Sequence, residues 1–192
     1  MKMDSIYDFA FRGLLAEEAL DRAGRPATTD FAKLDAIIAE RLSLDLLDET
    51  FVASAKQMAT VYAAIAAFEN SARKLISTVL LAQVGENWWE TSVSGPIRKK
   101  AETRRKDEQK IKFHAQRGDS PIIYTDLGDL GNIIGNNWGH FEAYIPTIEW
   151  AKSVFNTIEL SRNVIMHSGV LELGDIERVG INIRDWIKQV GA

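Results

Sequence analysis

The chain is predicted to be all-α, a helical bundle preceded by an N-terminal helical extension. Apolar residues recur at three- and four-residue spacing along most of the sequence, as in helices that bury one face. No segment alternates convincingly between apolar and polar residues, and the one candidate, residues 179–183, fits a helix as well. We therefore expect helices that pack on helices around one main core.

The composition is that of an ordinary globular protein. Of the 192 residues, 46% are hydrophobic and 26% are charged, which is enough for a sizeable core. The absence of cysteine excludes disulfides, thiolate catalysis and cysteine-ligated zinc. The first residues lack a signal-peptide pattern, and the longest uninterrupted apolar run, Val61–Phe68, is too short to span a bilayer. We expect a cytoplasmic protein that does not bind membranes.

Residues 1–48 form the predicted N-terminal extension. Apolar spacing predicts one helix over residues 4–23, and a second is expected after the capping residues Thr28, Thr29 and Asp30. We expect this extension to pack on the main domain or on a partner chain.

Residues 49–192 form the second predicted domain. Helices are expected over residues 49–84, 97–116, 124–138, 147–167 and 175–190. The fourth of these should begin after Pro146. Glycines at 128, 131, 135 and 139 form a stripe that should let a neighbouring backbone come close.

The helix expected after Pro96 is strongly basic. Residues 97–112 hold eight basic and three acidic side chains, a net charge of +5 in a chain whose total is −4. Such a strip could simply be a solvated face, or it could contact RNA phosphates. The candidate RNA-binding residues are Arg98, Lys99, Arg104, Arg105 and Lys106.

The segment Ser161–Gly169 holds the residues best suited to chemistry. Arg162 is a permanent cation that can bind a phosphate, Asn163 can donate hydrogen bonds, and His167 can transfer protons near neutral pH. On an ideal helix Arg162 and His167 lie about 140° apart, so they share a face only if the helix bends or ends at His167. The structural alternative is a histidine that caps the helix and an arginine that meets a carboxylate such as Glu159.

Glu69 and Arg73 are supporting candidates on the long helix predicted for residues 49–84. Their i,i+4 spacing is that of an ion pair on a helix surface. The functional alternative is that this pair faces a pocket formed by Arg162 and His167 and orients it.

Four groups of residues, taken in order, resemble the HEPN superfamily, in particular the branch found in a eukaryotic nuclear endoribonuclease and in bacterial defence proteins. They cover about residues 55–190 and leave the N-terminal stretch outside. They are Phe68-Glu69-Asn70-x-x-Arg73-Lys74-Leu75-Ile76, Gly85-Glu86-Asn87-Trp88-Trp89, Asp129-Leu130 to Trp138 with Phe141, and Arg162-Asn163-x-x-x-His167.

The resemblance implies a four- or five-helix bundle that forms a homodimer through the motif helices. It also implies metal-independent cleavage of single-stranded RNA, with Arg162, Asn163 and His167 as the catalytic residues. A related toxin branch that is inactivated by nucleotide transfer has a tyrosine two residues after the histidine. That position is Gly169 here, so the same control is not expected.

Two other classes of function stay open. Some members of the superfamily bind RNA without cutting it, so the chain could be a non-catalytic helical dimer that binds RNA or a partner protein. It could also be an antitoxin-like regulatory dimer in a toxin or phage-defence system. No cofactor or metal is expected, because His114, His140 and His167 have no ligand spacing and no His-Glu-x-x-His occurs.

Overall fold

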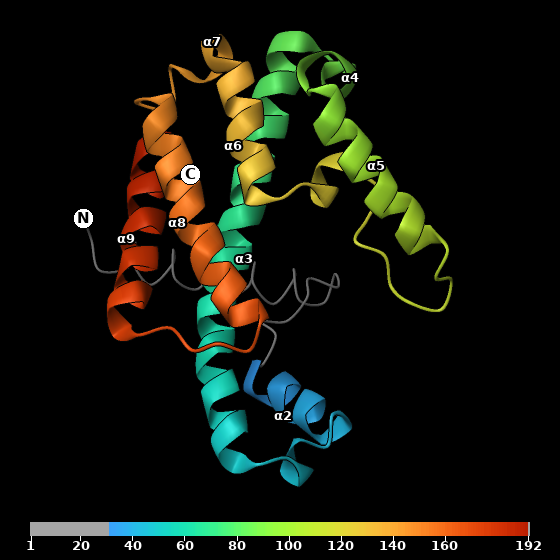
Figure 1. Cartoon of the computed structure of the whole chain (residues 1–192), viewed down its shortest axis with the longest axis vertical. Helices are drawn as coiled ribbons and strands as arrows, with labels where there is room; N and C mark the ends of the chain where they lie inside the picture. Colours follow the sequence, from blue (N-terminus) through green and yellow to red (C-terminus); the bar gives the residue numbers. More distant parts are fainter. Residues whose placement is uncertain (1–30, 192) are drawn as a thin grey trace, which may run out of the picture. The chain divides into compact units, whose positions relative to one another are not determined.

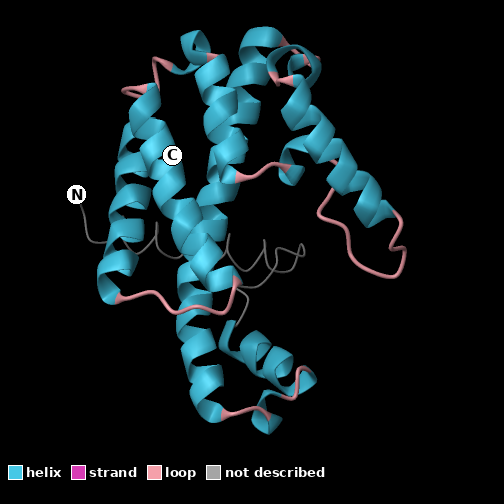
Figure 2. Cartoon of the chain, viewed as in Figure 1, coloured by secondary structure: helices cyan, strands magenta, loops and turns pink. Residues whose placement is uncertain are grey.

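The computed structural model describes residues 31–191 of the chain. The helix predicted for residues 4–23 lies outside the described residues, as does the capping cluster before residue 31. Every regular element between residues 31 and 191 is a helix, as Figure 2 shows. The prediction of an all-α fold is therefore confirmed.

The chain divides into two compact units, residues 1–52 and residues 53–192. In the described part of the first unit, helix α2 (Phe31–Arg41) is followed by η1 (Leu44–Leu46), a 3-10 helix of one turn. Ser43 lies between them with φ of 50°, a left-handed conformation that ends α2 and redirects the chain. The unit boundary at Val52 falls inside the following helix, α3.

Helix α3 (Glu49–Val84) has the bounds that the sequence predicts. Asp48 accepts hydrogen bonds from the backbone N–H groups of Thr50 at 2.9 Å and Phe51 at 3.4 Å, which satisfies the first turn. Gly85, with φ of 94°, ends the helix. Within the second unit the buried side chains lie at three- and four-residue intervals along one side of α3: Met58, Val61, Ile65, Phe68, Glu69, Ala72, Ile76, Val79 and Leu80.

The apolar middle of α3 is therefore buried on one side and not all round. By length and composition α3 is also able to cross a membrane, and only 22% of the 18-residue window that meets this test is buried. Core helices of proteins that never enter a membrane pass the same test, so this is weak evidence. The uninterrupted run Val61–Phe68 is too short to span a bilayer, but the longer window around it is long enough.

The main core joins α3 to three later helices, α6 (Leu127–Asn136), α8 (Ile148–Met166) and α9 (Leu173–Val190), shown in Figure 1. The ring of Phe68 on α3 lies 5.8 Å from Phe155 on α8 and 5.6 Å from Trp186 on α9, measured between ring centroids. Phe155 and Trp186 are themselves 5.1 Å apart. This aromatic cluster is almost fully buried and fixes three helices at one point.

The segment predicted as one helix over residues 124–138 is broken into three pieces. The 3-10 turn η2 (Pro121–Tyr124) comes first, and α6 and the short α7 (Trp138–Phe141) follow. Asp126 starts α6 with a capping box, in which the Asp129 side chain in turn accepts from the Asp126 N–H at 3.1 Å. Asn137 separates α6 from α7 by donating to the carbonyls of Ser92 and Ile133.

The glycine stripe of α6 meets side chains of α8. A Cβ atom at Gly131 would lie 3.2 Å from Cδ2 of Phe155, and one at Gly128 would lie 3.3 Å from Glu159 Oε2. Gly135 has ordinary contact distances to α8, and Gly139 lies outside α6 with no atom within 4 Å. The stripe thus admits a close helix neighbour through three of its four glycines, and side chains fill the space.

Two further helices lead away from the end of α3. The tryptophan pair lies on a short helix, α4 (Trp88–Ser92), in which Trp88 is buried. The basic helix is α5 (Gly95–Gln109), and only Ile97 and Ala101 of it are buried. The prediction that it continues to Gln116 is wrong. The chain turns back after Gln109, which allows Ile122 and Tyr124 of η2 to reach buried positions against α5.

Substitution at the stripe should test the α6–α8 packing. We expect Gly131→Leu to lower the free energy of unfolding by about 1–3 kcal/mol, because the side chain would collide with Phe155. The matched control, Gly139→Ala, should be neutral or stabilising by up to about 1 kcal/mol, since its Cβ meets open space on a helix. Urea unfolding followed by circular dichroism measures both. Equal effects of the two substitutions would contradict this packing.

Candidate functional site

Helix α8 carries the motif residues and ends where they end. It starts at Thr147, whose Oγ1 accepts from the N–H of Trp150 at 3.1 Å. His167 is its C-terminal cap, and Ser168 follows with φ of 61°. The helix is thus regular through Arg162 and stops at His167.

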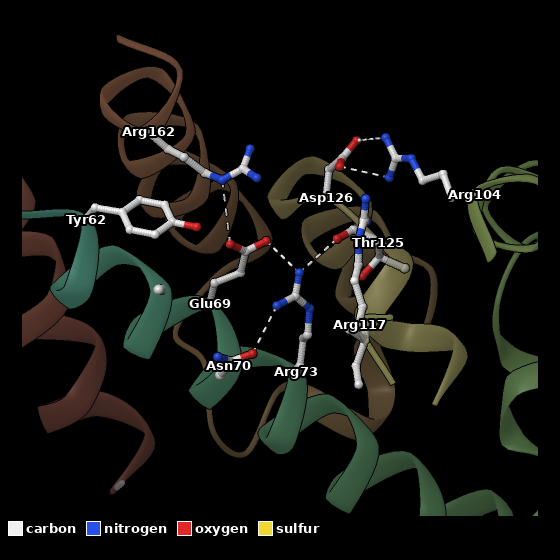
Figure 3. A pocket seen from close by; sticks show the side chains of 11 residues that line it. Tyr62, Glu69, Asn70, Arg73, Arg104, Arg117, Thr125, Asp126 and Arg162 are labelled. Carbon is white, nitrogen blue, oxygen red and sulfur yellow. Dashed lines mark hydrogen bonds and ion pairs between the residues drawn. The ribbon is translucent and has the colours of Figure 1, made fainter. Parts of the chain in front are cut away.

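A polar pocket of about 550 Å³ lies beside α8, and Arg162 points toward it in Figure 3. Side chains from α3, α5, α8 and the segment from Arg117 to Asp126 line the pocket. The residues are Tyr62, Ala66, Glu69, Asn70, Arg73, Arg104, Arg117, Ile123, Thr125, Asp126 and Arg162. Four of them are arginines and two are carboxylates, so the lining carries a net charge of +2.

Glu69 holds two of these arginines. It is 8% exposed, and its Oε1 lies 2.6 Å from Nη2 of Arg73. The other oxygen, Oε2, lies 3.8 Å from Nε of Arg162. Arg73 also donates to the backbone carbonyl of Thr125 at 3.0 Å and to Asn70 at 3.1 Å. The Glu69–Arg73 pair therefore faces the pocket and connects α3 to the start of α6.

Arg162 has the least engaged guanidinium of the four. Its side chain is 30% exposed, and its one ion pair within the described residues is the long contact to Glu69. Its buried Nε has no hydrogen-bond partner, and neither terminal nitrogen donates to another described residue. Two parallel N–H donors are therefore free, which is the arrangement that binds a phosphate in a bidentate manner.

Asp126 is the second carboxylate of the pocket and is bound by two cations of α5. Arg104 contacts its two oxygens at 2.9 Å each, and Lys100 approaches Oδ2 at 2.7 Å. Burial raises the pKa of Asp126, but the hydrogen bonds from Arg104 and Lys100 outweigh it and lower the pKa from 3.8 to about 2. Arg104 also donates to the carbonyl of Tyr124 at 2.8 Å. These contacts fix the basic helix against the start of α6.

Among the charged and aromatic residues that line the pocket, three were not predicted from the sequence: Arg117, Asp126 and Tyr62. Arg117 belongs to the segment after α5, pairs with Glu108 at 2.6 Å and stacks over the Tyr124 ring at 5.4 Å. The hydroxyl of Tyr62 points into the pocket in Figure 3. Asp126 could have been recognised as a helix cap, but none of the three forms a local motif with Arg162, so sequence spacing gave no signal.

His167 and Asn163 do not line this pocket. Both are exposed, and with Leu160 and Val164 they form an outward stripe at i, i+3, i+4 and i+7 of α8, whereas Arg162 lies on the pocket side. Leu160 is 60% exposed and Val164 is 40% exposed. The expected separation of Arg162 from His167 around the helix is therefore present, and one chain does not bring them into one pocket.

The five predicted RNA-binding residues of α5 are in different situations. Arg104 is bound to Asp126, Arg98 donates to the carbonyl of Val93 at 3.1 Å, and Lys106 pairs with Glu102 at 3.2 Å. In the described part of the chain, the side chains of Lys99 and Arg105 make neither a hydrogen bond nor an ion pair. These two cations stay available to an anion in solution.

Another carboxylate lies near Arg162 on α8. Burial raises the pKa of Glu159, the charge of Asp126 raises it further, and the charge of Arg162 opposes the shift. Arg162 meets Glu69 of α3, and no ion pair joins it to Glu159.

Between residues 31 and 191, no group of three or more histidine or carboxylate side chains could hold a metal ion.

Replacing Asp126 should reveal its charge pairs through their pH dependence. We expect Asp126→Asn to lower the free energy of unfolding at pH 7 by about 1–2 kcal/mol, because Lys100 and Arg104 lose a half-exposed partner. The folded-state pKa is depressed, so this stability is present above about pH 4 and disappears as the pH falls toward 2.

Urea titrations of wild type and variant at pH 7, 4 and 2.5 measure this effect. The control Asp107→Asn removes an exposed pair with Lys110 and should cost less than about 0.5 kcal/mol at every pH. A gap between wild type and Asp126→Asn that is as large at pH 2.5 as at pH 7 would disprove the assignment.

Comparison with family models, curated proteins and solved structures finds no match for this chain. The resemblance to the HEPN superfamily therefore rests on the motifs quoted above. The described residues form an arginine-rich pocket on one side of α8 and leave a histidine on the other side.

Proposed function

We propose that the protein is a metal-independent endoribonuclease of the HEPN type that cleaves single-stranded RNA, in a toxin or phage-defence setting. The observation that carries the proposal is the guanidinium of Arg162, directed into a cationic pocket with both terminal nitrogens free. An RNA strand offers the matching group, a phosphodiester with two acceptor oxygens.

The pocket is suited to one phosphate more than to an apolar ligand. Its lining combines four arginines with Asn70 and the Tyr62 hydroxyl. Arg73, Arg104 and Arg117 are paired with Glu69, Asp126 and Glu108, so the positive field acts mainly through Arg162. Arg162 would bind a phosphate of the strand in this pocket, on the side of α8 away from His167.

Cleavage needs a base and an acid, and each chain supplies one motif histidine. In the proposed reaction the ribose 2′-hydroxyl attacks the adjacent phosphorus, and the bond from phosphorus to the 5′-oxygen breaks. One His167 takes the proton of the 2′-hydroxyl, the second His167 gives a proton to the leaving 5′-oxygen, and Asn163 orients the phosphate. The products are a 2′,3′-cyclic phosphate and a 5′-hydroxyl.

The exposed stripe of α8 supports a homodimer as the catalytic unit. Leu160 and Val164 are large apolar side chains on the same face as Asn163 and His167. Met166 and Val170 nearby are also more than half exposed. A second copy that covers these side chains would bury apolar surface and bring two His167 residues together.

A second candidate is a non-catalytic module that binds RNA or a partner protein. The observation that favours it is the absence of Asn163 and His167 from the lining of the Arg162 pocket. Under this alternative the pocket binds a phosphate and no reaction follows. Overexpression separates the two, because a nuclease should arrest growth in a His167-dependent manner and a binding module should not.

An RNA cleavage assay tests the reaction. We expect cleavage of a single-stranded RNA in the presence of EDTA, with 2′,3′-cyclic phosphate ends, and no cleavage where the scissile ribose is 2′-deoxy. His167→Ala should slow cleavage by at least about 100-fold because a general acid and base are lost. The control His140→Ala, on α7, should leave the rate unchanged. Cleavage that survives His167→Ala at the wild-type rate would remove the nuclease proposal.

The oligomeric state tests whether the exposed stripe of α8 forms a dimer interface. We expect wild type to be dimeric by light scattering and Val164→Glu to be monomeric, because the charge would be buried in the interface. The matched control is Ile181→Glu, at a 49% exposed position on α9, which should stay dimeric. A wild-type monomer at assay concentration would contradict the two-histidine mechanism.

A further inference from the structure

The segment after α5 presents an aromatic side chain fully to solvent. Phe113 is 93% exposed, and Ile111, two residues earlier, is 47% exposed. The charged neighbours are Lys110 and Lys112, and Lys112 has no ion pair within the described residues. A lone exposed apolar residue needs no explanation, but an exposed aromatic that directly follows an unpaired lysine is a combination that binds single-stranded nucleic acid.

This tip loop, residues 110–116, has a fixed base. Glu108 at the end of α5 forms an ion pair with Nε of Arg117 at 2.6 Å and accepts a hydrogen bond from the Arg117 backbone N–H at 3.2 Å. Arg117 stacks over the buried Tyr124 ring, whose hydroxyl donates to the carbonyl of Gly118 at 3.2 Å. The two ends of the tip loop are therefore held together by these contacts, and Phe113 lies near the middle of the loop.

The base of the tip loop is also a wall of the arginine pocket. Arg104 precedes the loop and Arg117 follows it, and both line the pocket. Residues 104–117 hold six lysines and arginines against two carboxylates, a net charge of +4. Phe113 and Arg117 are four positions apart in the sequence, so their Cα atoms are at most about 14 Å apart. That distance lies within the span of the roughly 4–16 nucleotides that a single-strand site contacts.

We propose that Phe113 stacks on a base of the RNA strand whose phosphate lies in the arginine pocket, with Lys112 contacting a flanking phosphate. This inference rests on the proposed function only in its RNA-binding part and is independent of cleavage. Stacking on a phenylalanine tolerates any base, so the tip loop would add affinity for single strands without strict sequence choice.

The tip loop gives a reason for a strand to be preferred over a duplex. A base can lie on the Phe113 ring only if it is unpaired and free to leave its own stack. Phosphate contacts alone would accept either form of RNA. A basic loop with an apolar tip could also touch an anionic membrane, and the experiment below includes that outcome.

The test uses an eight-nucleotide 2′-O-methyl oligonucleotide, which cannot undergo 2′-hydroxyl attack, with fluorescence anisotropy at fixed salt. We expect Phe113→Ala to weaken binding by about 5- to 100-fold and Phe113→Trp to restore wild-type affinity. An abasic strand of the same length should bind wild type and Phe113→Ala equally. The matched control is Phe51→Ala, at a 75% exposed phenylalanine that follows Asp48 and Glu49; it should bind as wild type does.

The outcomes separate this inference from the proposed function. If Arg162→Ala abolishes binding and Phe113→Ala leaves it unchanged, the tip-loop inference is overturned and RNA binding at the pocket stands. If wild type does not bind the oligonucleotide, the tip-loop inference and the proposed RNA binding at the pocket are both overturned. Phe113-dependent binding to phosphatidylserine vesicles together with Phe113-independent binding to the oligonucleotide would assign the tip loop to a membrane and also overturn the inference.

Discussion

The carboxylate of Glu69 is the group on which the arginine pocket depends. It is buried, and its two oxygens face guanidinium groups from two helices, Arg73 on α3 and Arg162 on α8. A buried carboxylate is stable only when it is paired, and here the short contact to Arg73 provides that pairing. The 3.8 Å contact to Arg162 then orients a cation without consuming its hydrogen bonds. The same carboxylate therefore stabilises the fold and leaves Arg162 able to bind an anion.

Asp126 connects α5 to the rest of the structure through charge pairs, as Glu69 connects α3 to Arg162 of α8. The basic helix buries only Ile97 and Ala101, so hydrophobic contact alone would hold it weakly. Its connection to α6 is largely ionic, through Lys100 and Arg104. This divides the basic helix into cations that stabilise the structure and cations, such as Lys99, that stay free. A charge run in a sequence does not reveal that division, because it depends on which side chains meet a carboxylate from another element.

The fold was predictable where local patterns determine it. Helix α3 has the predicted bounds because Asp48 and Gly85 are strong end signals, and α8 begins after Pro146 as predicted, with Thr147 as its cap. The predicted end of α5 lies seven residues too late. No glycine or proline occurs between Gln109 and Gly118 to mark the turn, which is determined by distant contacts.

The candidate site was predictable only in part, for the same reason. Glu69, Arg73 and Arg162 carry motif spacing, and the structure brings them together. Arg117 enters the same pocket through its pairing with Glu108 and its stacking on Tyr124, neither of which has a sequence signature. Local spacing thus identified the arginine of each motif helix, and tertiary contacts supplied the rest of the pocket.

Because Arg162 and His167 lie on different sides of α8, a single chain cannot bring both side chains into one pocket. A five-residue separation rotates His167 about 140° from Arg162, and because α8 stays regular until Met166, nothing in the helix cancels that rotation. In the proposed function, phosphate binding on the pocket side would therefore be a property of one chain. Proton transfer would belong to the opposite side, where Leu160 and Val164 are exposed beside His167. If the same residues both bind and cleave RNA, the strand has to pass from the pocket across the edge of α8 to a face completed by a second copy. On this view binding and catalysis are separable, and association of two chains is what converts an RNA-binding surface into a nuclease.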